Sequence, residues 1–376
     1  MTSPPATHLV TTDVATYEVV NDITTHFGAF IVGRAVDELT GLPPQDPVEV
    51  TAALDGITPN APGENRRFSA STGDGGTFAL SGEVDRAFPN HATVAYQVDL
   101  EVRAFGYLPA PSNVAVPAAA SFPLPAVQVP LHRRAVWLEG RTIDGGGAPV
   151  ANTQVSVVQP AGMAGLQASL SFSHPPLTPI DIMAPAAVGA PLQLWRDAFA
   201  RETEVWLLSR INLAIGTLVR LTSPTSLEYA LVAALPGATN LSKPGRVVLR
   251  APISFHHSKA GATVQVLNPG LPTASTTLSG EAYPGDEVFF AASTAGFPSG
   301  AAIRVNDPTP SLVEWRIVFL PAAISSAPGG FYRLGPVGRT VALRLHAVPP
   351  VPPIPPDVTH LVDYGQQDNV LNLTVA

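Results

Sequence analysis

The sequence predicts an all-β fold with two β-sandwiches, an inserted β domain and one short helix. Three observations predict it. Short apolar stretches alternate with polar residues at a period of two, as half-buried strands require. Proline and glycine, 40 and 31 of the 376 residues, interrupt these stretches repeatedly. The start of the first strand-rich region also recurs later in the chain, which indicates a duplicated module.

The first strand-rich region follows an N-terminal arm of residues 1–27. Its longest alternating run, residues 94–104, places apolar side chains on one face of a strand. A glycine-dense turn at residues 73–76 leads into a short strand, as expected of a hairpin. Residues 28–133 thus have the size and pattern of one sandwich. Strands are expected at residues 30–37, 48–52, 77–80, 94–104 and 127–132.

The second sandwich is predicted to be split. Residues 139–144 match residues 32–37, including the Gly-Arg pair, but the segments that should follow occur only near the C-terminus. We therefore assign the second sandwich to residues 134–160 and 326–376, with a long insertion between them. The completing strands are expected at residues 331–334, 341–347 and 370–375.

The insertion is predicted to begin with a connector and to continue as one β domain. Residues 161–202 are rich in proline and alanine, which indicates the connector. Within them, Leu192, Trp195 and Phe199 are spaced by three and four residues, which predicts a short amphipathic helix near residues 192–200. Strand patterns resume after it, so residues 203–325 are assigned to an inserted β domain.

Five motifs stand out in the first strand-rich region: Gly-Arg-x-x-Asp (33–37), Pro-Pro (43–44), Val-x-Val (48–50), Gly-Gly-x-Phe-x-Leu (75–80) and Ala-Phe-Gly-Tyr (104–107). Together they resemble carboxypeptidase regulatory-like modules, which have an Ig-like, transthyretin-like sandwich. The resemblance covers residues 30–132 and, in split form, residues 135–159 with 326–376. It implies a spacer or docking unit without catalysis of its own. Residues 260–266 and 283–290 are also weakly similar to β modules of phage-tail-like and contractile injection particles.

Catalytic, metal and cofactor sites are not expected. The chain has no cysteine, no His-Glu-x-x-His helix and no Gly-x-Ser-x-Gly elbow. The adjacent pair His256 and His257 should point to opposite faces of a strand, so it cannot converge on one metal. Asp74, Asp144 and Asp286 stand beside glycines, where turn formation explains them. The net charge of −8 and the lack of a basic stripe argue against nucleic acid as a partner.

Four aromatic residues of the insertion region are candidates for binding a ligand such as a sugar: Trp195, Trp206, Tyr283 and Trp315. The alternative for each is a role in the hydrophobic core.

Two functions are compatible with these features. The first is a non-enzymatic structural component of a phage-tail-like or contractile injection particle, acting as a docking or spacer protein. The alternative is a ligand-binding adhesin or carbohydrate-binding module on a β-sandwich stalk. The expected partners are other protein subunits, with self-association as a further option, and no membrane span is expected. The N-terminus lacks a Sec-type signal pattern, so synthesis in the cytoplasm and incorporation into a particle or release are expected.

Overall fold

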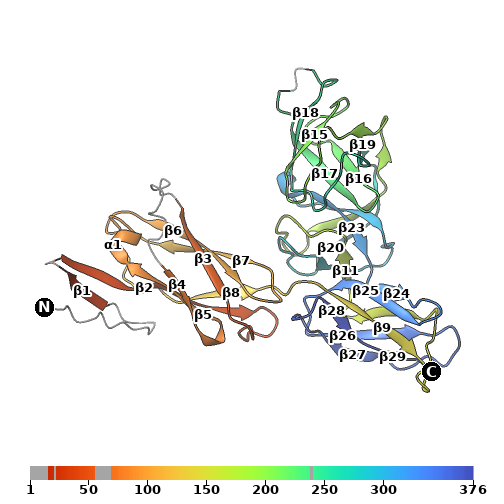
Figure 1. The fold of residues 1–376 in the computed structure, drawn as a ribbon, viewed down its shortest axis with the longest axis horizontal. Helices are drawn as coiled ribbons and strands as arrows, with labels where there is room; N and C mark the ends of the chain where they lie inside the picture. Colours follow the sequence, from red (N-terminus) through yellow and green to blue (C-terminus); the bar gives the residue numbers. More distant parts are fainter. Residues whose placement is uncertain (1–15, 21–22, 56–68, 238–239, 376) are drawn as a thin grey trace. The chain divides into compact units, whose positions relative to one another are not determined.

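Figure 1 shows the computed structural model of the chain, which describes residues 16–20, 23–55, 69–237 and 240–375. The chain divides into two compact units, unit 1 over Met1–Arg133 and unit 2 over Arg134–Ala376. Strands make up nearly all of the regular structure, and α1 (Val84–Ala87) is the one α-helix of the described residues. The predicted all-β class is confirmed, and its one short helix lies in unit 1 and not near residues 192–200.

Unit 1 contains two sheets around one core. One sheet has the order β1-β2-β5-β4 with β8 parallel to β2, and the other has the order β3-β6-β7. Phe30, Phe78 and Leu100 belong to the hydrophobic cluster that joins the two sheets. Residues 1–15 of the predicted arm lie outside the described residues. The strands are β1 (Thr16–Val20), β2 (Ile23–Asp37), β3 (Glu49–Asp55), β4 (Ser69–Thr72), β5 (Thr77–Glu83), β6 (Tyr96–Arg103), β7 (Ala110–Val116) and β8 (Val127–Leu131).

The pairing predicted for the split sandwich is present in unit 2. β9 pairs antiparallel with β25 and parallel with β28 and β29, as β2 pairs with β5 and β8 in unit 1. β10 pairs with β26, as β3 pairs with β6. In both sandwiches a glycine lies opposite an aromatic ring, Gly33 opposite Phe78 and Gly140 opposite Tyr332. The strands are β9 (Val136–Ile143), β10 (Gln154–Gln159), β24 (Ala322–Ile324), β25 (Phe331–Val337), β26 (Ala342–Val348), β27 (Val358–Leu361), β28 (Asp368–Val370) and β29 (Leu373–Thr374).

The insertion between β10 and β24 forms two β bodies, which we call the proximal and the distal body. The proximal body has the strand order β20-β12-β22-β23-β11-β21. Its strands are β11 (Met163–Leu166), β12 (Pro179–Met183), β20 (Pro272–Thr277), β21 (Val288–Phe290), β22 (Ala301–Val305) and β23 (Glu314–Phe319).

The distal body is itself inserted between β12 and β20 of the proximal body. Its strand order is β13-β19-β16-β17-β18-β15, and β14 also pairs with β19. Its strands are β13 (Ala186–Ala187), β14 (Leu192–Gln193), β15 (Glu204–Leu207), β16 (Leu218–Thr222), β17 (Leu227–Ala234), β18 (Gly245–Leu249) and β19 (Thr263–Asn268).

The predicted connector and its helix are wrong. Residues 161–202 contain β11 to β14, and residues 192–200 form no helix. Leu192 is buried in β14, whereas Trp195 and Phe199 are 50% and 55% exposed, so the three side chains do not share a buried face. The spacing of these residues predicted a helix, but this segment pairs with β19 and β15 instead. Such pairing with distant strands cannot be read from the local sequence pattern.

The two bodies are copies of one another that have exchanged strands. β18 and β19 correspond to β11 and β12, and β14 to β17 correspond to β20 to β23, with the same order in each sheet. Residues 163–234 and 246–319 are therefore tandem repeats, and each body takes strands from both. Every buried member of the proximal core has a counterpart in the distal core. Examples are Leu170 with Ile253, Ile180 with Val264, Phe297 with Leu213 and Val305 with Leu221.

The bodies of unit 2 are joined by packed junctions. Met163 and Val288 of the proximal body belong to the hydrophobic cluster of the split sandwich. A Cβ on Gly165 would lie 2.8 Å from Cδ of Pro336, so glycine is needed for this close approach. The junction between the proximal and distal bodies is a second cluster of Met183, Leu218, Leu267 and Trp315.

Candidate functional site

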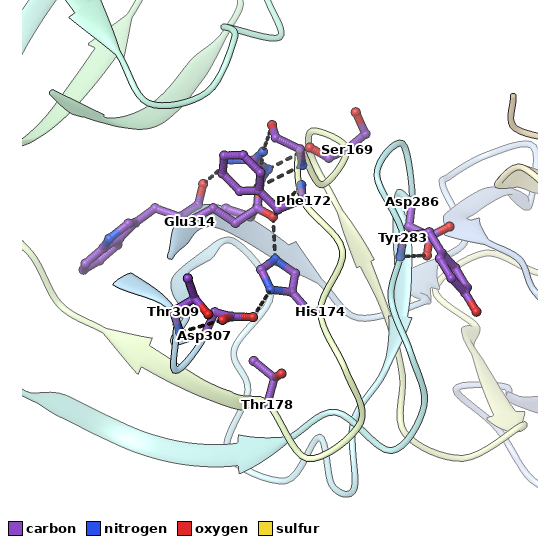
Figure 2. Close-up of polar contacts among 12 residues, drawn as sticks. Ser169, Phe172, His174, Thr178, Tyr283, Asp286, Asp307, Thr309 and Glu314 are labelled. Atoms are coloured by element: carbon purple, nitrogen blue, oxygen red, sulfur yellow. Dashed lines mark hydrogen bonds and ion pairs between the residues drawn. The ribbon is translucent and has the colours of Figure 1, made fainter. Parts of the chain in front are cut away.

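A buried histidine ties a loop of the proximal body to β23 (Figure 2). His174 is fully buried, with Nδ1 3.0 Å from a carboxylate oxygen of Asp307 and Nε2 2.7 Å from one of Glu314. The Glu314 carboxylate also accepts hydrogen bonds from the backbone N–H groups of Ser171, at 2.9 Å, and Phe172, at 3.3 Å. One carboxylate thus holds three groups of the loop.

The distal body repeats this arrangement. The Glu228 carboxylate accepts hydrogen bonds from the backbone N–H groups of Ser254, at 2.7 Å, and Phe255, at 3.2 Å, and lies 2.7 Å from Nε2 of His257. His257 is fully buried, and its Nδ1 has no hydrogen-bond partner among the described residues. We call the two arrangements the proximal and the distal Ser-Phe-x-His clasp. Only the proximal clasp has a second carboxylate, that of Asp307.

Ion pairs reinforce the proximal clasp. Burial lowers the pKa of His174, but the hydrogen bonds to Glu314 and Asp307 outweigh it, so the pKa is raised above the ordinary histidine value. Burial raises the pKa of Asp307, but hydrogen bonds from His174 and the backbone of Thr309 hold it below the ordinary value. The Arg316 guanidinium pairs with Glu314 at 2.5 Å. The basic side chains of His174 and Arg316 therefore lie beside the acidic side chains of Asp307 and Glu314 in the interior of the body.

The geometry of the two clasps fits a structural role, in which a histidine and a glutamate hold a loop in place. A general base needs a ring nitrogen within reach of a substrate proton, whereas both nitrogens of His174 face carboxylates. The ring of His257 is enclosed on all sides. The hydroxyl of Ser171 accepts a hydrogen bond from Arg316 at 2.8 Å and is not bonded to either histidine. Each clasp positions the segment that leads into β12 or β19.

Two of the four predicted ligand-binding residues lie together on the distal body. The ring centroids of Trp195 and Trp206 are 5.3 Å apart, with an interplanar angle of 54°. Trp195 is 50% exposed, and the Arg196 guanidinium lies 5.3 Å from the centroid of the Trp206 ring. Leu208, 46% exposed, follows two residues after Trp206, just beyond the end of β15. We call the surface of Trp195, Arg196, Trp206 and Leu208 the tryptophan face.

The other two predicted residues lie elsewhere. Trp315 is 3% exposed and belongs to the cluster between the two bodies, 6.2 Å from Tyr229. Tyr283 lies on the proximal body, with the Arg339 guanidinium of the split sandwich 5.1 Å from its ring centroid. Trp315 is thus a core residue, and Tyr283 is part of an intramolecular junction.

The turn aspartates and the histidine pair have local partners. Asp144 accepts hydrogen bonds from two backbone N–H groups of its own turn, and Asp286 accepts one from Tyr283. His257 points into the distal clasp, whereas the neighbouring His256 side chain is 51% exposed. No group of three or more His, Asp or Glu side chains in the described part of the chain is placed to hold a metal ion.

Sequence reasoning missed both clasps, although a signal was present. Ser-Phe-x-His occurs at residues 171–174 and 254–257, and a Pro-Thr segment ending in glutamate occurs at residues 224–228 and 308–314. The histidine of the first repeat contacts the glutamate of the second, and the reverse holds for the other pair. Neither contact follows from spacing within one repeat.

Comparisons with known proteins add no family. A scan against protein-family models, a search of curated proteins and a search of solved structures each give no match to this chain. Among the residues that the structure describes, no helix combines the length and apolar character needed to cross a membrane.

Proposed function

We propose that the protein is a non-enzymatic structural component of a phage-tail-like or contractile injection particle, in which it acts as a docking and spacer protein. The nesting of the bodies in unit 2 carries this proposal. Each inserted body is joined to the preceding one through two connections of two or three residues. Two short connections restrict rotation in a way that a single flexible linker does not, which suits a rigid spacer.

The junction between the split sandwich and the proximal body supports the same function. Arg339 pairs with Asp286 at 3.1 Å, and these side chains are 11% and 2% exposed. Apolar side chains of both bodies share one cluster beside this pair. A desolvated ion pair within an apolar contact favours one orientation of the two bodies.

The particle is the part of the proposal that comes from the sequence resemblance. Its test is to tag the chain in the organism that produces it, separate particles by sedimentation and locate the tag by immunogold electron microscopy. We expect the tag on particles in a constant ratio to their major subunit, with a tagged cytosolic protein absent from those fractions. A tag found only in the soluble fractions would contradict the proposal.

The second candidate is a carbohydrate-binding module, favoured by the exposed Trp195 ring. The angle of 54° between Trp195 and Trp206 prevents a flat platform under two successive sugar rings, so stacking would involve one ring at Trp195. A glycan array probed with the full chain and with Trp195→Ala tests this candidate. Binding that the substitution abolishes would favour it over the docking protein.

A further inference from the structure

We propose that the distal body binds the surface of a lipid bilayer with anionic headgroups, through the tryptophan face and the loop that follows β15. We call residues 208–216 the distal loop, and residues 292–300, their counterparts in the proximal body, the proximal loop. This inference goes beyond the proposed docking function. Two independent observations carry it: large apolar side chains that the fold does not require, and a local excess of positive charge.

The distal and proximal loops have the same backbone structure. The N–H of Leu213 donates to the carbonyl of Arg210 at 3.1 Å, and the N–H of Phe297 donates to that of Thr294 at the same distance. Leu213 and Phe297 are both buried. The two loops can therefore be compared position by position. Further matched pairs are Asn212 and Gly296, both with positive φ, and Trp195 and Ser279, whose N–H groups donate to the carbonyls of Trp206 and Phe290.

The distal body has large apolar side chains at exposed positions where the proximal body has small ones. Ile211 and Ile215 of the distal loop are 50% and 72% exposed, and Leu208 and Trp195 are about half exposed as well. Because the proximal loop has the same backbone without such side chains, the fold does not require them. Exposed apolar groups of this kind mark contacts with a protein or a membrane. The proximal counterparts of Trp195, Leu208, Ile211 and Ile215 are Ser279, Ala292, Ala295 and Ser299, all of them exposed.

The distal body is also positively charged, unlike the rest of the chain. Residues 184–271 contain eight arginine and lysine residues, among them both lysines of the chain, and four acidic residues, for a net charge of +4. The remaining residues contain 13 basic and 25 acidic residues, for a net charge of −12. An anionic surface therefore attracts the distal body and repels the rest of the chain.

Positive groups lie beside the exposed apolar side chains. The Arg196 guanidinium lies 5.3 Å from the ring centroid of Trp206. The N–H of Arg210 in the distal loop donates to the carbonyl of Leu241 at 2.7 Å, and Lys243 follows two residues later with an exposed side chain. Among the described residues, no carboxylate pairs with Arg196 or Lys243. Both cations are therefore available to an anionic partner.

An anionic bilayer satisfies both features at once. Its headgroups attract arginine and lysine, and its interfacial layer accommodates tryptophan and aliphatic side chains. A nucleic acid or an anionic polysaccharide would pair with the cations but offers no hydrocarbon layer to Ile211 and Ile215. Side chains on loops can enter the interfacial layer singly, so no complementary groove is needed. The contact is peripheral, and no segment of the distal body crosses the bilayer.

The first test measures binding of the full chain to vesicles by co-flotation. We expect saturable binding to phosphatidylcholine vesicles that contain about one third phosphatidylglycerol, and binding roughly tenfold weaker to pure phosphatidylcholine. The double variant Ile211→Ser/Ile215→Ser should bind the anionic vesicles roughly tenfold more weakly. The control Ile354→Ser removes another half-exposed isoleucine, in the split sandwich, and should leave binding unchanged.

The second test measures how deeply the tryptophan face enters the bilayer. Lipids brominated on their acyl chains quench the fluorescence of tryptophans that contact them. We expect such vesicles to quench the chain, and Trp195→Phe to remove most of the quenching, because Trp315 is buried. Phenylalanine keeps an apolar ring at this position, so Trp195→Phe should still bind the vesicles.

Three results would overturn the inference. The first is no binding to anionic vesicles, or equal binding by the double variant. The second is binding without quenching, which would show that charge alone holds the chain at the headgroups. The third is a dimer in analytical ultracentrifugation that the double variant dissolves, which would assign the surface to a second copy of the chain. All of these measurements use the purified chain, so their outcome is independent of whether the protein occurs in particles.

Discussion

Removal of the Glu228 carboxylate tests whether the two strand-exchanged bodies unfold together. Glu228→Ala leaves the backbone N–H groups of Ser254 and Phe255 and Nε2 of His257 without their acceptor. Each buried polar group left unpaired costs about 1–3 kcal/mol. Because these losses are not additive, we expect the substitution to lower the free energy of unfolding of the distal body by about 3–5 kcal/mol.

We expect the destabilisation to extend to the proximal body, because the distal body is inserted between two proximal strands, β12 and β20. If the distal body unfolds, residues 184–271 become an open loop between β12 and β20. Closing a loop of about 90 residues costs roughly 4 kcal/mol, from (3/2)RT ln n. Unfolding would also expose the cluster that contains Met183 and Trp315. Loop closure and exposure of this cluster together cost an amount comparable with the whole stability of a small domain, about 5–15 kcal/mol. The proximal body is therefore expected to unfold with the distal body.

Hydrogen exchange read by mass spectrometry measures the opening of each strand separately. In Glu228→Ala we expect protection of β11 and β12 to fall by the same free energy as that of β16 and β19. Glu314→Ala, the matched change in the proximal clasp, should lower protection of β11 and β12 more than that of β16 and β19, because the strands of the distal body form one continuous segment of the chain that contains no open loop when the proximal body unfolds. Strands of unit 1 act as the internal reference and should not change. Loss of protection confined to residues 186–268 in Glu228→Ala would refute the coupling.

Three further predictions concern unit 2. The raised pKa of His174 contributes stability in full below the ordinary histidine pKa and loses it as the pH rises through the raised value, so the urea midpoint should fall over that rise and fall less in His174→Gln. Gly140→Ala should destabilise unit 2 by about 1–3 kcal/mol in urea unfolding, because its Cβ would overlap the Leu371 carbonyl. The control Gly280→Ala, where the added Cβ meets open space, should change the free energy of unfolding by less than about 0.5 kcal/mol. Deleting residues 329–376 should abolish exchange protection of β9 and β10 but not of unit 1; protected β9 and β10 would contradict the split sandwich.

The sequence by itself determined the main strands of the two sandwiches and the split of the second one. A strand with one buried face alternates at a period of two whatever its partner is, so residues 94–104 could be assigned without knowledge of the fold. The split was visible because the backbone geometry of a turn needs particular residues. Gly76 and Gly330 both have positive φ, at 71° and 65°, before the strand that pairs with β2 or β9.

Only the tertiary structure decided which repeat completes which body. Tandem repeats carry the same apolar pattern in each copy, so β11 and β12 match the strands of either repeat equally well in sequence. The choice depends on how the chain is connected in space, which periodicity does not contain. The clasps depend on that choice, because His174 meets Glu314 only after the strands are exchanged.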